Sequence, residues 1–364
     1  MKTLVITCLI MVLALGGIFA QGGAEKLDIG LAMPETHVER WQRDGAALLD
    51  AATKLGYTAE VAYGDADQSK QNQQIQDFIT KGAKLIVIGS VNEGVTSVVS
   101  DAAADGVIVI AYDRLITGSK DYDYYITFDN FKVGQFQGLA IEKALGLKTA
   151  SSADPKYITL FAGSPTDNNA NFFFDGAMSV LRPYAESGVV KLVGPAPLDS
   201  KSPDFTRIAT ENWRADVAKT RMENLLGNDA INVTLDAVLA PNDTLARAII
   251  EALMTDEKYN SIDKLPVVTG QDGEIASIQY IRDGKQYMTV FKDTRELAAA
   301  AINLADALLK GESPNIPGAR LDEKSYDTGK KIVKSYLFEP VNVTKDNYKE
   351  IMIDSGYYTE EDIK

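Results

Sequence analysis

Residues 106–116 read GVIVIAYDRLI, and this stretch decides the fold class of the chain. Five consecutive apolar residues, 107–111, follow a glycine and run almost directly into charged residues. A short apolar run without alternation is typical of a parallel β-strand that helices cover on both faces. Asp113 and Arg114 then follow the carboxyl end of a buried strand, either as a neutralised surface turn or as part of a binding site.

Similar runs recur on both sides of this strand and alternate with segments of helical spacing. The sequence predicts further strands in LDIGLAMP (27–34), TAEVAYG (58–64), AKLIVIGS (83–90), YITLFAG (157–163), VVKLVGP (189–195), DAVLAP (236–241), PVVTG (266–270) and YMTVF (287–291). Apolar spacing predicts helices over 41–55, around 75–79, before 106, and over 172–184, 217–226, 245–254 and 295–309. This alternation predicts an α/β protein with parallel sheets, in two blocks that meet near residue 130. At 364 residues the chain is long enough for two domains.

The first residues belong to neither block. Lys2 precedes an apolar run over 4–20 and then QGGAEK, the pattern of a secretory signal peptide. We expect residues 1–24 to be removed, with cleavage near Ala20 or Ala24. Cys8, the only cysteine, lies inside this run rather than after it, so we do not expect lipid attachment there. A large exported chain without disulfides suits a bacterial cell envelope, and we expect a periplasmic protein.

Composition excludes several function classes. The net charge of −14 argues against nucleic acid as a partner, since no excess of basic residues could neutralise phosphates. The chain has neither a Gly-rich dinucleotide motif nor a P-loop, and its single histidine and single cysteine cannot form a metal cluster. DADQSKQNQQIQ (65–76) has lysine where a calcium loop needs glycine, and its last position is glutamine. We therefore expect no cofactor and no metal ion.

Polar residues gather where the predicted strands end. Carboxyl ends of strands line the ligand crevice of open α/β sheets, so we expect one shared site there. Asp243 and Asp293 also have a simpler explanation as helix caps. The candidate site residues are Arg40, Asp113, Arg114, Asn169, Asn242, Asp272 and Lys292.

This mixture of donors and acceptors favours a neutral ligand that is dense in hydroxyl groups. Each sugar hydroxyl both donates and accepts, and its bonds to ionised partners are the stronger ones. The only two tryptophans, Trp41 and Trp213, stand in the polar contexts ERWQR and ENWRAD. An indole ring in such a context can lie against the apolar face of a sugar, although core packing is the ordinary role of tryptophan.

Six motifs carry a resemblance to a known family. They are ERWQRDG (39–45), IAYDRLI (110–116), GSPTDNNA (163–170), LAPND (239–243), TGQD (269–272) and FKDTRELA (291–298). Together they resemble the pentose- and hexose-binding receptors of bacterial ATP-driven sugar transport, over nearly the whole mature chain. The tail SGYYTEED (355–362) looks like the multiple-sugar-binding members, and the xylose-binding members are also similar.

The resemblance implies the roles of individual residues. Direct sugar contacts would come from Arg40, Trp41, Asp113, Arg114, Asn169, Trp213, Asn242, Asp272 and Lys292, with the stretch 221–224 following the second tryptophan. Asp113 and Arg114 would bind neighbouring hydroxyls of the sugar, and each would fix the orientation of the other. His37 departs from the family pattern, and we interpret it as a loop residue rather than a ligand contact.

The resemblance also implies an architecture of the periplasmic binding protein type I class. Two Rossmann-like lobes would be joined by three crossing segments, near 128–131, 290–293 and 333–338. We expect an N-terminal lobe of 25–130 plus 292–335 and a C-terminal lobe of 131–291 plus 336–364. Sugar binding would close the lobes, and the closed monomer would dock on the membrane permease of an ABC transporter, whose partner subunit hydrolyses ATP.

Alternatives remain at this point. The bound sugar could instead be presented to a chemotaxis or signalling receptor. A sugar-responsive repressor would carry a helix-turn-helix in place of the signal peptide. A glycosidase would need a carboxyl with a raised pKa, which the cationic neighbours of Asp113 and Asp272 disfavour. Xylose, glucose, galactose, arabinose and fucose are all candidates, and we favour D-xylose and D-glucose.

Overall fold

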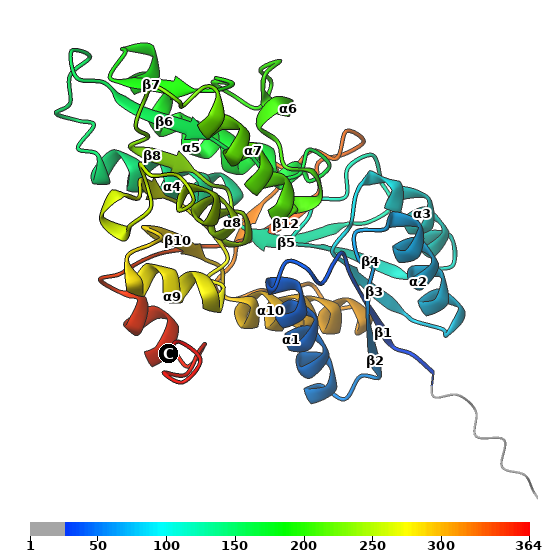
Figure 1. Ribbon diagram of the computed structural model, residues 1–364. Coiled ribbons are helices and arrows are strands. Elements are labelled where there is room, and N and C mark those ends of the chain that lie inside the picture. Colours follow the sequence, from blue (N-terminus) through cyan, green and yellow to red (C-terminus); the bar gives the residue numbers. More distant parts are fainter. Residues whose placement is uncertain (1–25) are drawn as a thin grey trace, which may run out of the picture.

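The computed structural model describes residues 26–364. The predicted signal peptide and Cys8 lie outside the described residues. Two α/β lobes are visible in Figure 1, one built around β1–β5 and the other around β6–β10. Among residues 26–364, no helix combines the length and the apolar character that crossing a membrane requires.

Seven strands form the larger sheet, in the order β11-β12-β5-β4-β3-β1-β2. All neighbouring pairs are parallel except β11 with β12, at the edge. The strands are β1 (Ile29–Met33), β2 (Ala59–Tyr63), β3 (Leu85–Ile88), β4 (Ile108–Tyr112), β5 (Tyr124–Phe128), β11 (Arg320–Asp322) and β12 (Lys334–Phe338).

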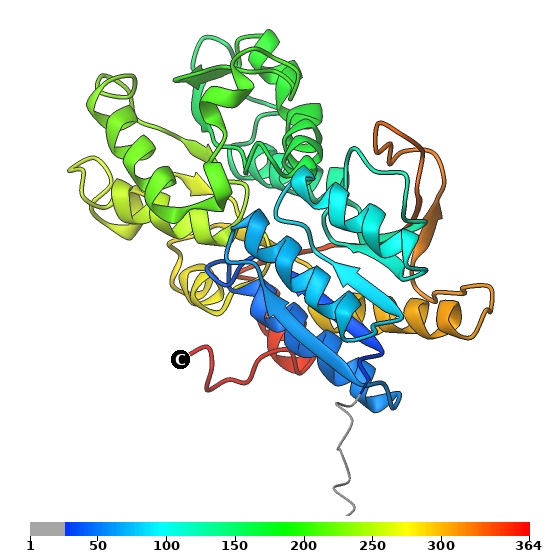
Figure 2. The ribbon, with the colours of Figure 1, turned by 90° about the vertical axis from the view of Figure 1, so that its right-hand side faces the viewer.

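Helices cover both faces of this sheet, which explains its unbroken apolar strands (Figure 2). Helices α1 (Arg40–Lys54) and α10 (Thr294–Leu309) pack together on one face, and α2 (Gln68–Thr80) and α3 (Thr96–Ala104) lie on the other. Within β4, residues 110 and 112 belong to the core under α1 and α10, whereas 109 and 111 belong to the core under α2 and α3. The run at 107–111 is therefore buried from both sides, as predicted.

The second lobe repeats this layering around four parallel strands, in the order β7-β6-β8-β9. A separate antiparallel pair, β10 with β13, lies beside it. The strands are β6 (Lys156–Leu160), β7 (Val190–Val193), β8 (Ala237–Leu239), β9 (Val267–Val268), β10 (Met288–Phe291) and β13 (Val341–Thr344). The helices are α4 (Asn130–Ala144), α5 (Asn168–Glu186), α6 (Phe205–Ile208), α7 (Ala215–Gly227), α8 (Asp243–Leu253) and α9 (Ile275–Asp283).

The chain passes between the lobes at three places: from β5 to α4, from β10 to α10, and from β12 to β13. Two of these segments touch, because Asp129 N donates to Phe338 O at 2.9 Å. The expected lobe boundary between 335 and 336 falls inside β12, which pairs with β5 as far as Phe338. We therefore propose that the third boundary lies between Phe338 and Val341.

Strands β5 and β12 are regular elements that the strand predictions above do not include. β5 reads YYITF, and three of its side chains carry hydroxyls, two of which point to the same neighbouring turn. Both hydroxyls, of Tyr125 and Thr127, donate to the backbone oxygen of Asp113. Hydropathy alone therefore does not predict β5, because the hydroxyls count as polar although they form hydrogen bonds inside the fold.

Candidate ligand-binding site

All nine predicted site residues line one pocket between the lobes. Arg40 and Trp41 open α1, Asn169 lies in the first turn of α5, and Trp213 lies in the loop before α7. The other five follow the ends of strands. The pocket is also lined by Val38, Asp167, Phe173 and Gln271. Every one of the nine is at most 6% exposed, so the structure shows a closed arrangement.

The closed pocket is tight. Its free volume is about 20 Å³, which is room for roughly one water molecule. A ligand of sugar size can therefore enter only when the lobes separate and the side chains spread. The three crossing segments permit such a hinge motion.

One charged group joins α1 of the first lobe to the strand ends of both lobes. Arg40 Nε donates to Asp44 Oδ2 and its Nη1 to Asp113 Oδ2, both at 2.9 Å. Across the cleft, Asp272 Oδ1 lies 3.6 Å from Arg40 Nη1 and 3.0 Å from Lys292 Nζ. The cations and carboxylates of this group pair with one another. Buried charges are costly unless they are paired in this way.

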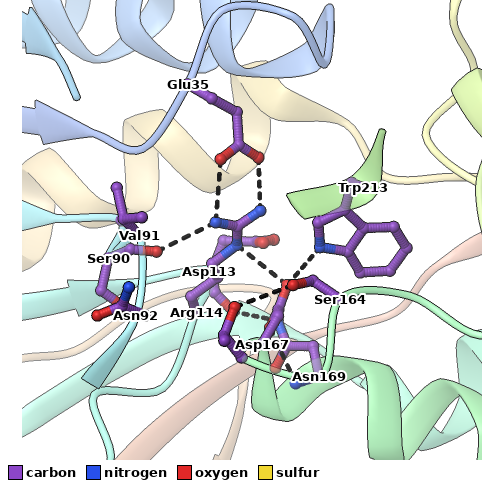
Figure 3. Close-up of polar contacts among 12 residues, drawn as sticks. Glu35, Ser90, Val91, Asn92, Asp113, Arg114, Ser164, Asp167, Asn169 and Trp213 are labelled. Atoms are coloured by element: carbon purple, nitrogen blue, oxygen red, sulfur yellow. Dashed lines mark hydrogen bonds and ion pairs between the residues drawn. The ribbon is translucent and has the colours of Figure 1, made fainter. Parts of the chain in front are cut away.

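A second charged group surrounds Arg114 (Figure 3). Its Nη2 donates to Glu35 Oε1 at 2.6 Å and its Nη1 to Ser90 O at 3.1 Å. From the other lobe, Asp167 Oδ2 lies 3.0 Å from Arg114 Nε and accepts from Trp213 Nε1 at 3.2 Å. The prediction that Asp113 and Arg114 hold each other in place is wrong: each is oriented by other residues, because adjacent side chains at this strand end point to different partners.

Asn169 makes a further contact across the cleft. Its Nδ2 donates to Asp113 O at 2.7 Å, and its Oδ1 accepts from Asn130 Nδ2 at 2.9 Å. Asn169 is thus fully engaged in holding the turn after β4. In the closed structure, Asn169 therefore stabilises the turn after β4, in addition to lining the pocket.

Each tryptophan packs on a glycine: Gly89, directly after β3, and Gly163, three residues after β6. The Trp41 ring is flanked by the guanidinium carbons of Arg40 and Arg114, at 5.0 and 5.1 Å from its centroid. A Cβ on Gly89 would lie 2.9 Å from this ring, and a Cβ on Gly163 would lie 2.0 Å from the ring of Trp213. Trp213 also meets Phe173 edge to face, at 6.4 Å between centroids.

The Gly163→Ala substitution should therefore displace Trp213. A contact of 2.0 Å is impossible, so the indole must leave the pocket or the loop must move. We expect ligand affinity to fall at least about tenfold, as for loss of an aromatic anchor. The matched control is Gly227→Ala at the end of α7, where an added Cβ meets nothing within 4 Å. Equal affinities of the two variants, measured by calorimetry, would contradict this account of Trp213.

Three site residues have a backbone in the left-handed region, which L-residues seldom adopt. Their φ angles are +59° at Asp113, +53° at Trp213 and +99° at Asp272. Such strain persists only where surrounding contacts impose it, and it concentrates at functional sites. At Asp272 the next residue, Gly273, is also left-handed, and its carbonyl accepts from Tyr358 Oη at 2.7 Å. The C-terminal segment thus supports this turn.

Several polar atoms of the pocket are buried without a hydrogen-bond partner. They include Arg40 Nη2, Arg114 Nε, Gln271 Oε1 and Asp272 Oδ1. Two of them, Arg114 Nε and Asp272 Oδ1, lie at ion-pair distance from an opposite charge but are not aligned as hydrogen bonds. Buried groups of this kind cost stability unless they are satisfied, so the donor Arg40 Nη2 and the acceptor Gln271 Oε1 are the atoms of this pocket that a ligand could satisfy.

The charge state of Asp113 does not suit acid catalysis. Burial raises the pKa of this carboxyl, but the nearby cations, above all Arg40 and Lys292, outweigh burial and hold the pKa below its ordinary value. In Asp167 the balance is opposite, because burial outweighs Arg114 and raises the pKa. Within residues 26–364 no cluster of three or more histidine, cysteine or carboxylate side chains could hold a metal ion.

Sequence reasoning missed several members of the site. Phe173 could have been found, because it follows Asn169 by four residues on the same face of α5. Gln271 precedes the predicted site residue Asp272 in the motif TGQD, and only the structure shows that Gln271 also lines the pocket. Glu35 pairs with Arg114 and Asp44 pairs with Arg40, and no local sequence pattern predicts either pair.

Other predicted features lie outside the pocket or have a different role. His37 is exposed in a loop, as expected, and its Nε2 lies 2.9 Å from Asn212 O of the other lobe. Asp293 caps α10, which confirms its interpretation as a helix cap. Asp243 does not cap α8: Asn242 does so, while Asp243 is buried and accepts from the backbone of Glu274.

Two α/β lobes that close over a pocket of charged and aromatic side chains define a two-lobed solute receptor. The chain belongs to the family described as the periplasmic binding protein domain, which matches residues 29–313. Its fold is the type I fold of that class, and the family's members are receptors for solutes.

Individual relatives are similar over nearly their full length. The multiple sugar-binding periplasmic receptor ChvE of Rhizobium radiobacter is 43% identical, over 94% of this chain and 93% of its own. The D-xylose-binding periplasmic protein of Escherichia coli is 34% identical, over 93% of both chains. The crystal structure of an ABC transporter solute-binding protein from Clostridium phytofermentans with bound β-D-glucose has a TM-score of 0.84 and 41% identity, covering 92% of this chain and 99% of that one.

Proposed function

We propose that this protein is an extracytoplasmic receptor for a monosaccharide, D-glucose, D-xylose or a related aldose. The observation that carries the proposal is the set of buried donors and acceptors without partners in a pocket between the lobes that both tryptophans also line. A pyranose presents a ring of hydroxyls and an apolar face, which match these two kinds of group. Relatives named for multiple sugars and for D-xylose support the same ligand class.

The receptor binds its sugar without transforming it. Hydrolysis would require a free carboxyl that stays protonated near a glycosidic bond, but nearby cations lower the pKa of Asp113. Burial raises the pKa of Asp167, yet this carboxyl is already engaged by Arg114 and by Trp213 Nε1. A bound sugar would add the hydrogen bonds that the closed pocket lacks, and its binding free energy would thereby favour the closed lobes. The closed form, periplasmic and monomeric, would deliver the sugar to the permease of an ABC transporter.

Presentation of the sugar to a chemotaxis or signalling receptor is the alternative use of the same closed form. Both uses begin with recognition of the sugar-loaded shape. Pull-down of membrane proteins with the sugar-loaded and sugar-free protein distinguishes them: recovery of a permease supports transport, and recovery of a signalling receptor alone supports sensing.

Thermal unfolding against a panel of monosaccharides tests the ligand class. A ligand at 100 times its dissociation constant adds about 2.7 kcal/mol to the free energy of unfolding, which raises the midpoint by a few degrees. We expect one or a few aldoses to do so and xylitol, which lacks the ring, to have no effect. A midpoint that no aldose changes, or that inositols or nucleosides raise instead, contradicts the proposed ligand class.

A further inference from the structure

A second cleft lies in the lobe of β6–β9 and shares no lining residue with the sugar pocket. It has a free volume of about 330 Å³, far more than the closed sugar pocket. The end of β6 and the loop after β7 line it, α6 and α7 supply polar side chains at 207, 221 and 224, and residue 228 follows the end of α7. It is large enough for a small molecule in the structure as it stands.

Arg221 is the unusual member of this cleft. Its Nη1 donates to Ala209 O at 2.9 Å and its Nη2 to Thr210 Oγ1 at 3.2 Å. Its guanidinium carbon lies 3.9 Å from the centroid of the Phe161 ring. A guanidinium has five N–H donors, so these two bonds leave three, and Nε is buried without a partner.

The two fully buried arginines of the described chain, in contrast to the partly buried Arg221, are paired with carboxylates. Arg40 binds Asp44 and Asp113, and Arg114 binds Glu35. Arg221 forms no ion pair with any described residue, and burial alone lowers its pKa to about 9. A partly buried cation without a counter-charge loses hydration that nothing replaces, and an anion in the cleft would offset that loss.

We propose that this cleft binds a small oxyanion, a carboxylate or a phosphate, through Arg221. Planar recognition of an oxyanion by a guanidinium is the strong, charge-assisted mode. The side chains of Asn224, Asn228 and Arg207 line the same cleft. Arg207 also pairs with Asp204 at 3.2 Å and Asn228 Nδ2 donates to Asn224 O at 2.7 Å, so only their remaining N–H groups could bind an anion. Asp229 also lines it, and its negative charge favours a small anion over a highly charged one.

The anion would act on the sugar pocket through the loop before α7. Arg221 holds the loop at residues 209 and 210, and Thr210 N in turn donates to Gly163 O at 3.0 Å. Three residues further along the loop is Trp213, whose strained backbone depends on the surrounding contacts. An anion that fixes Arg221 therefore stabilises the placement of Trp213 and raises sugar affinity. This coupling rests on the proposed function, whereas the anion site does not.

The site is tested first without sugar. Calorimetry and thermal unfolding are carried out with inorganic phosphate and, separately, with acetate, at an ionic strength held constant with sodium chloride. We expect saturable binding of at least one of them, and the two arms show which oxyanion is preferred. A response no larger than that to sodium chloride alone overturns the proposal.

Variants assign the binding to Arg221. Arg221→Gln should abolish it, and Arg214→Gln, at an exposed arginine that pairs with Asp216 at 2.6 Å, should not. Because Arg221→Gln could unfold the loop, Asn224→Asp provides a second variant. It places a carboxylate three residues along α7, which should pair with Arg221 and compete with the anion. Anion binding that survives in both cleft variants overturns the assignment.

Coupling is then read from the sugar titration. We expect saturating anion to lower the dissociation constant of the sugar at least about fivefold, and sugar to lower that of the anion by the same factor. Anion binding without any effect on sugar affinity would retain the site and overturn the coupling. A protein that binds the anion but no sugar would instead contradict the proposed function.

Discussion

Asp272→Ala is expected to weaken monosaccharide binding at least about thirtyfold, or about 2 kcal/mol. Asp272 Oδ1 is the carboxylate oxygen nearest to Lys292 Nζ, at 3.0 Å, and it also faces Arg40. Without this carboxylate, two buried cations lose a counter-charge and the ligand loses an acceptor that has no hydrogen-bond partner in the closed pocket. Isothermal titration calorimetry measures the loss.

Two further variants separate charge from backbone strain at this position. Asp272→Asn removes the charge but keeps a residue that tolerates positive φ, so it should also bind weakly while unfolding at a higher temperature than Asp272→Ala. Asp283→Ala removes an exposed carboxylate at the end of α9 and should leave affinity unchanged. If Asp272→Asn bound like the wild type, the negative charge would have no part in recognition.

Trp213→Ala is expected to cost at least about 2 kcal/mol of binding as well. The indole is 5% exposed and donates to Asp167, which in turn pairs with Arg114 of the other lobe. Its removal takes away a ring that could lie on the sugar and weakens the contact between the lobes. Trp213→Phe should recover part of the affinity, since it restores an apolar ring but no N–H donor. Binding within tenfold of the wild type in both Trp213→Ala and Asp272→Ala would contradict the assignment of the site.

The position of the site could be predicted from sequence, because carboxyl ends of parallel strands meet at one edge. Asp113 and Arg114 follow β4, Asn242 follows β8 and Asp272 follows β9, and the structure brings them together. The apolar run at 107–111 likewise predicted a strand buried on both faces.

The detailed geometry could not be predicted in the same way. The pairing of charged side chains depends on the tertiary structure. The sequence therefore did not predict that Glu35 and Asp167 pair with Arg114. The left-handed backbone at Asp113, Trp213 and Asp272 is imposed by surrounding contacts, and no local propensity indicates it. Gly163 could be recognised as essential only once the ring of Trp213 was seen against it.

Titration of the protein, without its predicted signal peptide, with D-glucose and with D-xylose in a calorimeter tests the central claim most directly. The account predicts saturable binding of at least one of the two at a single site per chain, weakened at least about thirtyfold by Asp272→Ala. A folded protein that binds neither sugar, or that binds one with undiminished affinity after Asp272→Ala, would contradict it.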